Sequence, residues 1–208
     1  MPARLSFTRR SSFVSVLSLC TLLLGLALVP APATAATMGD DGLHKEEWFS
    51  ITFRDIAEDI HAANEAGKRL VLVFEQRGCI YCRKMHEVLL ADPEVRDYIK
   101  ANYMVVQYNM FGDEEVTDLD GEALTEKTAA RKWGYLFTPT VVFLPDTVPT
   151  GKSVAQAAVS IMPGSFGKGT FLDMFRWVRE KGYETDEHFQ KYHARMIEQR
   201  RKQGGKTD

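Results

Sequence analysis

Cysteine is scarce in this chain, with 3 residues among 208. Cys20 lies in an apolar segment near the N-terminus, whereas Cys79 and Cys82 form one closely spaced pair. So few cysteines exclude a fold stapled by several disulfides, as found in many small secreted proteins. We therefore expect the pair to carry chemistry rather than to hold the fold together.

A surplus of basic charge is also absent. The chain has 26 Lys and Arg against 28 Asp and Glu, and without the three arginines of its first 35 residues the balance is 23 − 28 = −5. Such a charge gives no basis for strong binding to nucleic acid or to anionic lipid. Nucleic acid is therefore not expected among the partners.

Histidine, a common metal ligand, is also scarce, with 5 residues and no closely spaced pair among them. A closed zinc site needs four ligands, and Cys79 with Cys82 supplies only two, so we expect no such metal site. His86, one helical turn beyond Cys82, is expected to be a solvated helix residue. Cu(I) accepts two thiolates, and a copper-delivery module that uses this pair stays open as an alternative.

The N-terminal segment has the layout of an export signal. Arg4, Arg9 and Arg10 precede an apolar stretch of about 17 residues, from 13 to 29, which ends before Ala33-Thr34-Ala35. This order predicts a cleavable signal peptide over residues 1–35 and a periplasmic protein without stable membrane insertion after cleavage. A membrane anchor is the alternative, because the stretch is near the lower length limit for a span.

The remainder has no internal repeat and the size of one domain with its own core. Residues 36–48 are small or polar and are expected to be a flexible mature N-terminus. Residues 49–182 form the expected domain, and residues 183–208 a C-terminal helix with a charged tail, frayed from residue 199. Residues 111–121 are acidic and irregular, and Asp118 to Gly121 is expected to be a solvated surface loop.

Hydrophobic spacing predicts alternating strands and helices in the domain. The expected strands are 68–74, which is apolar on both faces and therefore central, 103–108, 140–144 and an edge strand at 157–162. The expected helices are 51–66, one continuing past residue 89, one starting at 92–93, one capped by Thr125, 171–178 and one after residue 189.

Cys79 directly follows the strongest strand and precedes a helical pattern, which is the layout of a thioredoxin-like redox site. The first sulfur then lies at a helix N-terminus, where unpaired backbone N–H groups favour a thiolate. Arg77, Arg83 and Lys84 either add to this effect or are ordinary surface charges. Cys82 lies one turn further on and can resolve a mixed disulfide, so the pattern predicts thiol–disulfide exchange.

Two further residues are candidates for the site. Glu75 lies on the same strand face as Val73 and is either a proton shuttle behind Cys82 or a solvated residue at the strand end. Pro139 begins a strand after Thr138. A cis Thr138–Pro139 bond would leave the Thr138 backbone open to a substrate chain, and an ordinary trans proline is the alternative.

These motifs, in this order, resemble the thioredoxin-like superfamily over roughly residues 49–182. Within it, the chain resembles the SoxW-type periplasmic thioredoxins of sulfur-oxidising bacteria, and more distantly the catalytic domains of DsbC-type isomerases. The segments that carry the likeness are Gly67-Lys68, Gly78 to Cys82, Met85, Asp120-Gly121, Ala130 to Gly134 and Thr138 to Phe143.

The resemblance implies an α/β, thioredoxin-like fold with a central mixed β-sheet flanked by helices on both faces. It implies that Cys79 attacks, that Cys82 resolves and that the two form a redox-active disulfide. Thr138, Pro139 and Tyr81 would dock the substrate, with Pro139 as the cis-proline. The chain departs from thioredoxins at Val73, where they carry a buried acid, so either Glu75 substitutes or the proton passes through water.

The function that follows is that of a periplasmic thiol–disulfide oxidoreductase. We expect it to reduce protein disulfides and to require no cofactor. A membrane thiol-reductase would be its electron donor, and a link to sulfur oxidation is implied. A disulfide oxidase or isomerase is the alternative within the same chemistry.

Overall fold

The computed structural model describes residues 36–204. The expected signal peptide and Cys20 therefore lie outside the described residues. Within residues 36–204, no helix is both long enough and apolar enough to cross a membrane.

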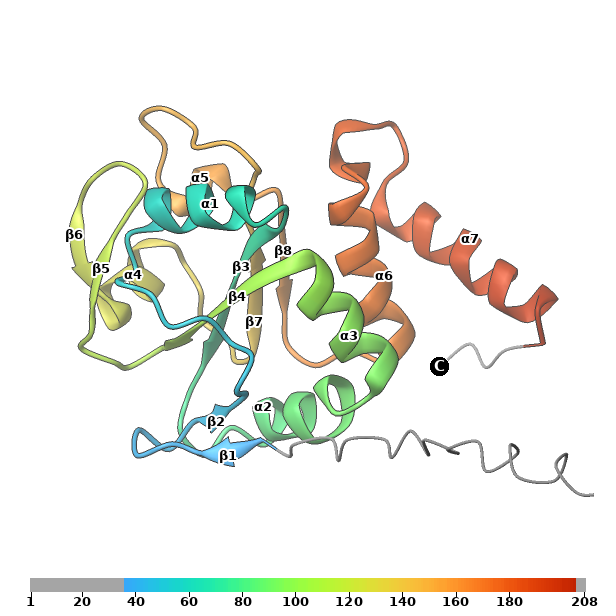
Figure 1. The fold of residues 1–208 in the computed structure, drawn as a ribbon, viewed down its shortest axis with the longest axis horizontal. Helices are drawn as coiled ribbons and strands as arrows, with labels where there is room; N and C mark the ends of the chain where they lie inside the picture. The colour runs from blue at the N-terminus through green and yellow to red at the C-terminus, as the bar shows by residue number, and fades with distance from the viewer. Residues whose placement is uncertain (1–35, 205–208) are drawn as a thin grey trace, which may run out of the picture. The chain divides into compact units, whose positions relative to one another are not determined.

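A four-stranded sheet forms the centre of the domain, in the order β4-β3-β7-β8 (Figure 1). β3 (Arg69–Glu75) pairs in parallel with β4 (Tyr103–Asn109) and antiparallel with β7 (Thr140–Phe143), which pairs antiparallel with β8 (Ser160–Pro163). Every residue of β3 is buried, as its apolar run on both faces requires of a central strand. The expected mixed sheet is confirmed.

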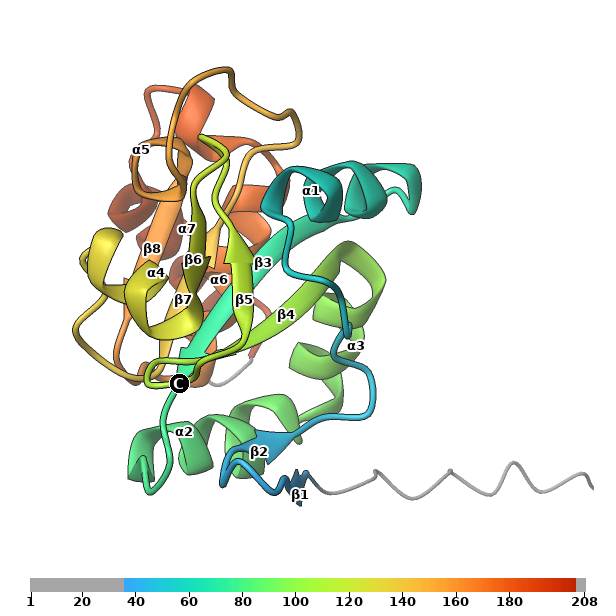
Figure 2. The same cartoon turned by 90° about the vertical axis from the view of Figure 1, so that its left-hand side faces the viewer.

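In the part of the chain that the structure describes, seven α-helices lie around this sheet (Figure 2). They are α1 (Ile56–Glu65), α2 (Ile80–Lys84), α3 (Pro93–Asn102), α4 (Glu126–Lys132), α5 (Val154–Ala157), α6 (Lys168–Arg179) and α7 (Phe189–Lys202). A π-helical segment (Met85–Leu90) continues α2, and a 3₁₀ turn (Gly182–Glu184) precedes α7. Asp55, Asp92 and Thr125 cap α1, α3 and α4 by accepting backbone N–H groups.

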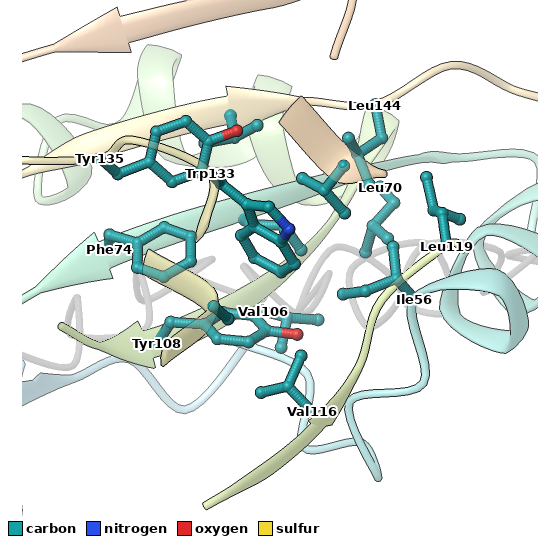
Figure 3. Packing of buried hydrophobic residues seen from close by; sticks show 14 of the residues in the cluster. Ile56, Leu70, Phe74, Val106, Tyr108, Val116, Leu119, Trp133, Tyr135 and Leu144 are labelled. Atoms are coloured by element: carbon teal, nitrogen blue, oxygen red, sulfur yellow. The ribbon is translucent and has the colours of Figure 1, made fainter. Parts of the chain in front are cut away.

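Two hydrophobic cores lie on opposite faces of the sheet, because alternate residues of β3 point in opposite directions. Leu70, Leu72 and Phe74 pack with α1, α4 and α5, whereas Val71 and Val73 pack with α3, α6 and the π-helical segment. In the first core, aromatic rings surround Phe74, with Tyr108 stacked on it and Trp133 edge-on (Figure 3). Helices thus cover both faces, as expected.

The first helix starts later than the apolar spacing predicts. Arg54 has a positive φ of 56°, which breaks the helical path, and α1 begins at Ile56 after the Asp55 cap. Ile51 and Phe53, expected on the buried helix face, are 100% and 97% exposed. These two positions were predicted wrongly because spacing alone does not detect a turn between apolar residues.

Three other segments also differ from expectation. The N-terminal segment contains a hairpin of β1 (Thr37–Met38) and β2 (His44–Lys45), and the acidic segment contributes a strand to a second hairpin, β5 (Glu115–Thr117) with β6 (Ala123–Thr125). α5 occupies the start of the expected edge strand, so that β8 begins only at residue 160.

The C-terminal helix is held by a buried carboxylate. Asp173 of α6 is fully buried and accepts two hydrogen bonds from the Arg200 guanidinium, at 2.8 and 2.9 Å. His193 of α7 lies 2.6 Å from the same carboxylate. These contacts hold α7 against α6 as far as Arg200, and the helix continues to Lys202, whereas the sequence suggested a frayed tail from residue 199.

The segment expected to be a solvated surface loop is only half exposed, because Asp120 and Gly121 are exposed as predicted but Asp118 and Leu119 are buried. Asp118 is 2% exposed, and its carboxylate accepts from the Trp133 indole and the Val154 backbone, both at 2.8 Å. The Lys132 ammonium lies 2.6 Å from Asp118 and 2.7 Å from both Asp120 and Glu122. The Lys132 ammonium thus lies between these three carboxylates and balances part of their negative charge.

Replacing Lys132 with Met should therefore lower the free energy of unfolding. The side chain of Asp118 is fully buried and that of Lys132 is 25% exposed. Leaving this carboxylate without its cation should cost about 2 kcal/mol, less than for a fully buried pair. Urea unfolding would measure the loss. Lys127→Met, on the same helix, is the control, because its partner Asp113 is exposed and the expected change is about 0.5 kcal/mol or less. Equal losses for the two variants would contradict this role of Lys132.

Candidate active site

The two cysteines of the Cys-x-x-Cys pair meet at the end of β3. Gly78 has a φ of 72°, which lets the chain turn sharply from the strand into α2. Cys79 is the N-cap of α2, and its Sγ accepts the Cys82 backbone N–H at 3.0 Å. The two sulfurs form a disulfide. Cys79 is partly exposed and Cys82 only 1% exposed, so a large reactant can reach only the first sulfur.

Thr138 and Pro139 lie beside Cys79, as the sequence predicted. The Thr138–Pro139 peptide bond is cis, and the Thr138 hydroxyl lies 3.3 Å from the Cys79 Sγ. The Pro139 carbonyl accepts from Gly164, which ties it to the end of β8. Among the described residues, the Thr138 backbone N–H and C=O groups have no hydrogen-bond partner. They are available for a chain that pairs beside the sulfur.

Exposed apolar side chains flank the same sulfur. Ile80 and Tyr81, between the cysteines, are 63% and 54% exposed. Leu136 and Phe137, directly before Thr138, are 74% and 66% exposed. Each of these four residues lies within two positions of Cys79 or of Thr138, which contacts Cys79, and we call them the apolar rim. Exposed apolar surface of this kind marks an interaction site.

Glu75 is fully buried, so its alternative placement as a solvated residue is wrong. Its Oε1 lies 2.9 Å from His86 Nε2 and accepts from the Gln107 amide, also at 2.9 Å. Its Oε2 is buried and has no partner among the described residues. The sequence thus places a carboxylate correctly on the Val73 face of β3, but its proton-shuttle role stays a prediction.

His86 is also buried, at 1% exposed, which contradicts the expectation of a solvated helix residue. Its Nδ1 lies 2.9 Å from Glu46 Oε1, and its Nε2 faces Glu75. Burial opposes the charged imidazolium, but hydrogen bonds with Glu46 and Glu75 outweigh this and raise the pKa of His86 to about 9. We call Glu46, His86 and Glu75 the His86 triad.

The N-terminal hairpin packs against the His86 triad from outside the main sheet. The His44 ring stacks on His86 with 5.4 Å between ring centroids, and the Gln107 amide donates to the His44 carbonyl at 2.7 Å. Lys45 donates to the Gln107 amide oxygen at 2.8 Å, and the Trp48 indole donates to Glu46. The hairpin and the residues after it are therefore bound closely to β3, β4 and the π-helical segment.

His86 and Glu46 were not predicted as parts of the site. One signal was available for His86, because Cys82, Met85, His86 and Leu89 share one face of a helix and all are buried. No local pattern marks Glu46, which reaches His86 across 40 positions of the chain.

Within residues 36–204, no group of three or more His, Cys, Asp or Glu residues is arranged to hold a metal ion.

The sequence family described as a thioredoxin-like domain matches residues 56–163, slightly more than half of the chain. No curated protein matches the chain.

Several solved structures also match the chain. A thioredoxin-fold protein from Helicobacter pylori is 20% identical, covers 62% of this chain and 80% of its own, and gives a TM-score of 0.49. A thioredoxin from Thermus thermophilus is 26% identical over 62% of this chain and 86% of its own, with a TM-score of 0.47. The oxidised C-terminal domain of DsbD from Neisseria meningitidis is 18% identical over 62% and 96%, with a TM-score of 0.42.

Proposed function

This chain belongs to the thioredoxin-like domain family, and we propose that its thiol–disulfide oxidoreductase activity serves to reduce protein disulfides in the periplasm. One observation supports a protein substrate above all. The partly exposed Cys79 lies against Thr138, whose backbone groups are unpaired, inside an apolar rim. An extended substrate chain can pair with this backbone while its apolar side chains cover the rim.

In the reduced protein, the Cys79 thiolate attacks one sulfur of a substrate disulfide. A bond forms between Cys79 and that sulfur, and the other substrate sulfur leaves as a thiolate. The Cys82 thiolate then attacks Cys79 Sγ and releases the substrate. The product is the Cys79–Cys82 disulfide present in the structure. Two electrons pass from the dithiol to the substrate, and the chain needs no cofactor for this exchange.

Cys82 must lose a proton before it can attack, and its buried position gives water little access. Glu75 is the proposed proton acceptor, acting with His86. His86 is one helical turn beyond Cys82 on the same buried face, and it is hydrogen-bonded to Glu75. This arrangement would replace the buried acid that thioredoxins carry at the position of Val73. Tyr81, on the exposed side of α2, is proposed to contact the docked substrate instead.

Insulin reduction with dithiothreitol tests the proposed reductase. We expect the wild-type protein to accelerate precipitation of the insulin B chain, and Cys79→Ser to be inactive. A copper-delivery module would bind Cu(I) through both sulfurs without accelerating the reaction. An isomerase would in addition restore activity to scrambled ribonuclease, and an oxidase would have an equilibrium potential well above that of thioredoxin, measured against glutathione.

The periplasmic location is a separate proposal, supported by the sequence layout of residues 1–35. We expect the mature protein to begin near Ala36 and to appear in an osmotic-shock fraction. N-terminal sequencing of that material would measure the cleavage point. Recovery of the uncut chain in the membrane fraction would contradict the proposal. The membrane thiol-reductase donor and the link to sulfur oxidation derive from the resemblance to SoxW-type proteins and need a genetic test in the source organism.

A further inference from the structure

A small cleft of about 170 Å³ lies beside Cys79. Met38, Gly42 and His44 of the N-terminal hairpin form one side, and Gln76, Cys79 and Arg83 form the other. The hairpin lies outside residues 56–163, the part that matches the family. One wall of the cleft therefore comes from outside the matched region and lies directly at the attacking sulfur.

This wall is held in place by the contacts already described. The His44 carbonyl accepts from Gln107, and the His44 ring stacks on the buried His86. On the hairpin itself, Asp41 accepts from the Leu43 backbone at 3.0 Å and from the Lys45 ammonium at 2.6 Å. A ligand that enters the cleft would therefore find a formed wall and would not have to order a loose segment.

The polar lining of the cleft is basic or neutral. Its polar side chains belong to His44, Gln76 and Arg83, and no carboxylate lines it. Within the described residues, Arg83 has one ion pair, to Glu87 at 3.9 Å, which is too long for a hydrogen bond. Its guanidinium donors can therefore turn to a ligand carboxylate, a group that they match geometrically.

The size of the cleft limits the ligand to a small group. Pockets for drug-sized ligands measure roughly 300–1,000 Å³, well above this volume. Neither Thr138 nor Pro139 lines the cleft, so it lies on another side of Cys79 from the Thr138 backbone, although Ile80 belongs both to its lining and to the apolar rim. A substrate other than a protein disulfide, namely a small disulfide that carries negative charge, fits this position.

We propose that the cleft binds the carboxylate-bearing half of a low-molecular-weight disulfide, so that the protein also exchanges with small anionic thiols. This inference rests on the proposed function because it uses the same thiol–disulfide exchange, but its substrate is a different one. The Cys79 thiolate attacks the disulfide and bonds to the half in the cleft, while the other half leaves as a thiolate. Cys82 then attacks Cys79, closes the protein disulfide and releases the bound half as a second thiolate. The dithiol loses two electrons and the small disulfide gains them.

The test compares two small disulfides on the reduced full chain. One is 3,3′-dithiodipropionate, which carries two carboxylates, and the other is the neutral bis(2-hydroxyethyl) disulfide. The readout is the ratio of their second-order rate constants for oxidation of the protein, because this ratio cancels any change in the nucleophilicity of Cys79. Arg83→Gln and His44→Gln test the cleft. Lys84→Gln is the matched control, because Lys84 is the next basic residue along the helix and does not line the cleft.

We expect Arg83→Gln to lower the ratio by roughly three- to fivefold, the upper range for an exposed ion pair with good geometry. His44→Gln should lower it in the same direction, and Lys84→Gln should change it by less than about twofold. An unchanged ratio in Arg83→Gln, or equal drops in Arg83→Gln and Lys84→Gln, would overturn the proposal. Insulin reduction by the same preparations is scored separately, so failure of the protein-reductase function is distinguishable from failure of the cleft.

Discussion

Cys82→Ser is expected to accumulate mixed disulfides with its substrates, and Cys79→Ser to form none. Cys79 is the sulfur that substrates can reach, whereas Cys82 is 1% exposed and can attack only the bond that Cys79 has formed. Loss of the nucleophile should reduce insulin-reduction rates on the order of 10³-fold or more. Non-reducing electrophoresis after acid quenching would show the trapped complexes.

The reduced wild-type protein offers an independent check of the same roles. Cys79 should react with iodoacetamide much faster than Cys82, because it is more exposed and caps α2, where backbone N–H groups stabilise a thiolate. Mass spectrometry of partly alkylated protein would give both rates across pH. Equal rates, or mixed disulfides on Cys82 in the Cys79→Ser variant, would reverse the assignment.

Raising the pH should destabilise the oxidised protein through His86. The pKa of this residue is raised from 6.5 to about 9, so its charged form is favoured by folding. The resulting stability is fully present below pH 6.5 and is lost as the pH rises through 9. A shift of this size corresponds to about 3 kcal/mol of unfolding free energy. Glu46, Glu75 and His44 are the titratable groups that face His86 from the neighbouring elements.

Urea unfolding at several pH values would measure this loss. The oxidised form is the right one to use, because cysteines in a disulfide do not titrate. His86→Gln should be less stable at pH 6.5 and should lack most of the decline toward pH 9. His61→Gln is the control, since His61 is an exposed residue of α1 and should follow the wild type. A decline of the same size in His86→Gln would show that other groups cause it.

Local signals made much of the fold and of the reactive pair predictable. The apolar run of β3, the caps at Asp92 and Thr125 and the Cys-x-x-Cys spacing each depend on neighbours within a few positions. The Thr138–Pro139 pair could be placed because strand order brings the start of β7 beside the end of β3, where Cys79 follows. Each of these features is confirmed in its position.

The features that were missed depend on contacts between distant segments. His86 is polar and close to a helix N-terminus, where solvent exposure is the ordinary outcome, and only Glu46 and Glu75 explain its burial. Asp118 looks like a loop residue until Trp133 and Lys132 are placed around it. Charge pairs of this kind leave no periodic pattern in the sequence, so hydrophobic spacing cannot detect them.

The N-terminal hairpin also decides where the working unit of this protein begins. A shortened protein limited to residues 56–163 would contain both cysteines and the cis-proline, and would match its family in full. It would lack Glu46, one of the two counter-charges of His86, and the wall that His44 contributes beside Cys79. It would also lack α6, which covers the second core. The region that matches the family is therefore shorter than the region whose contacts build the proposed active site, and a shortened version of this protein should keep the residues from the hairpin to α6.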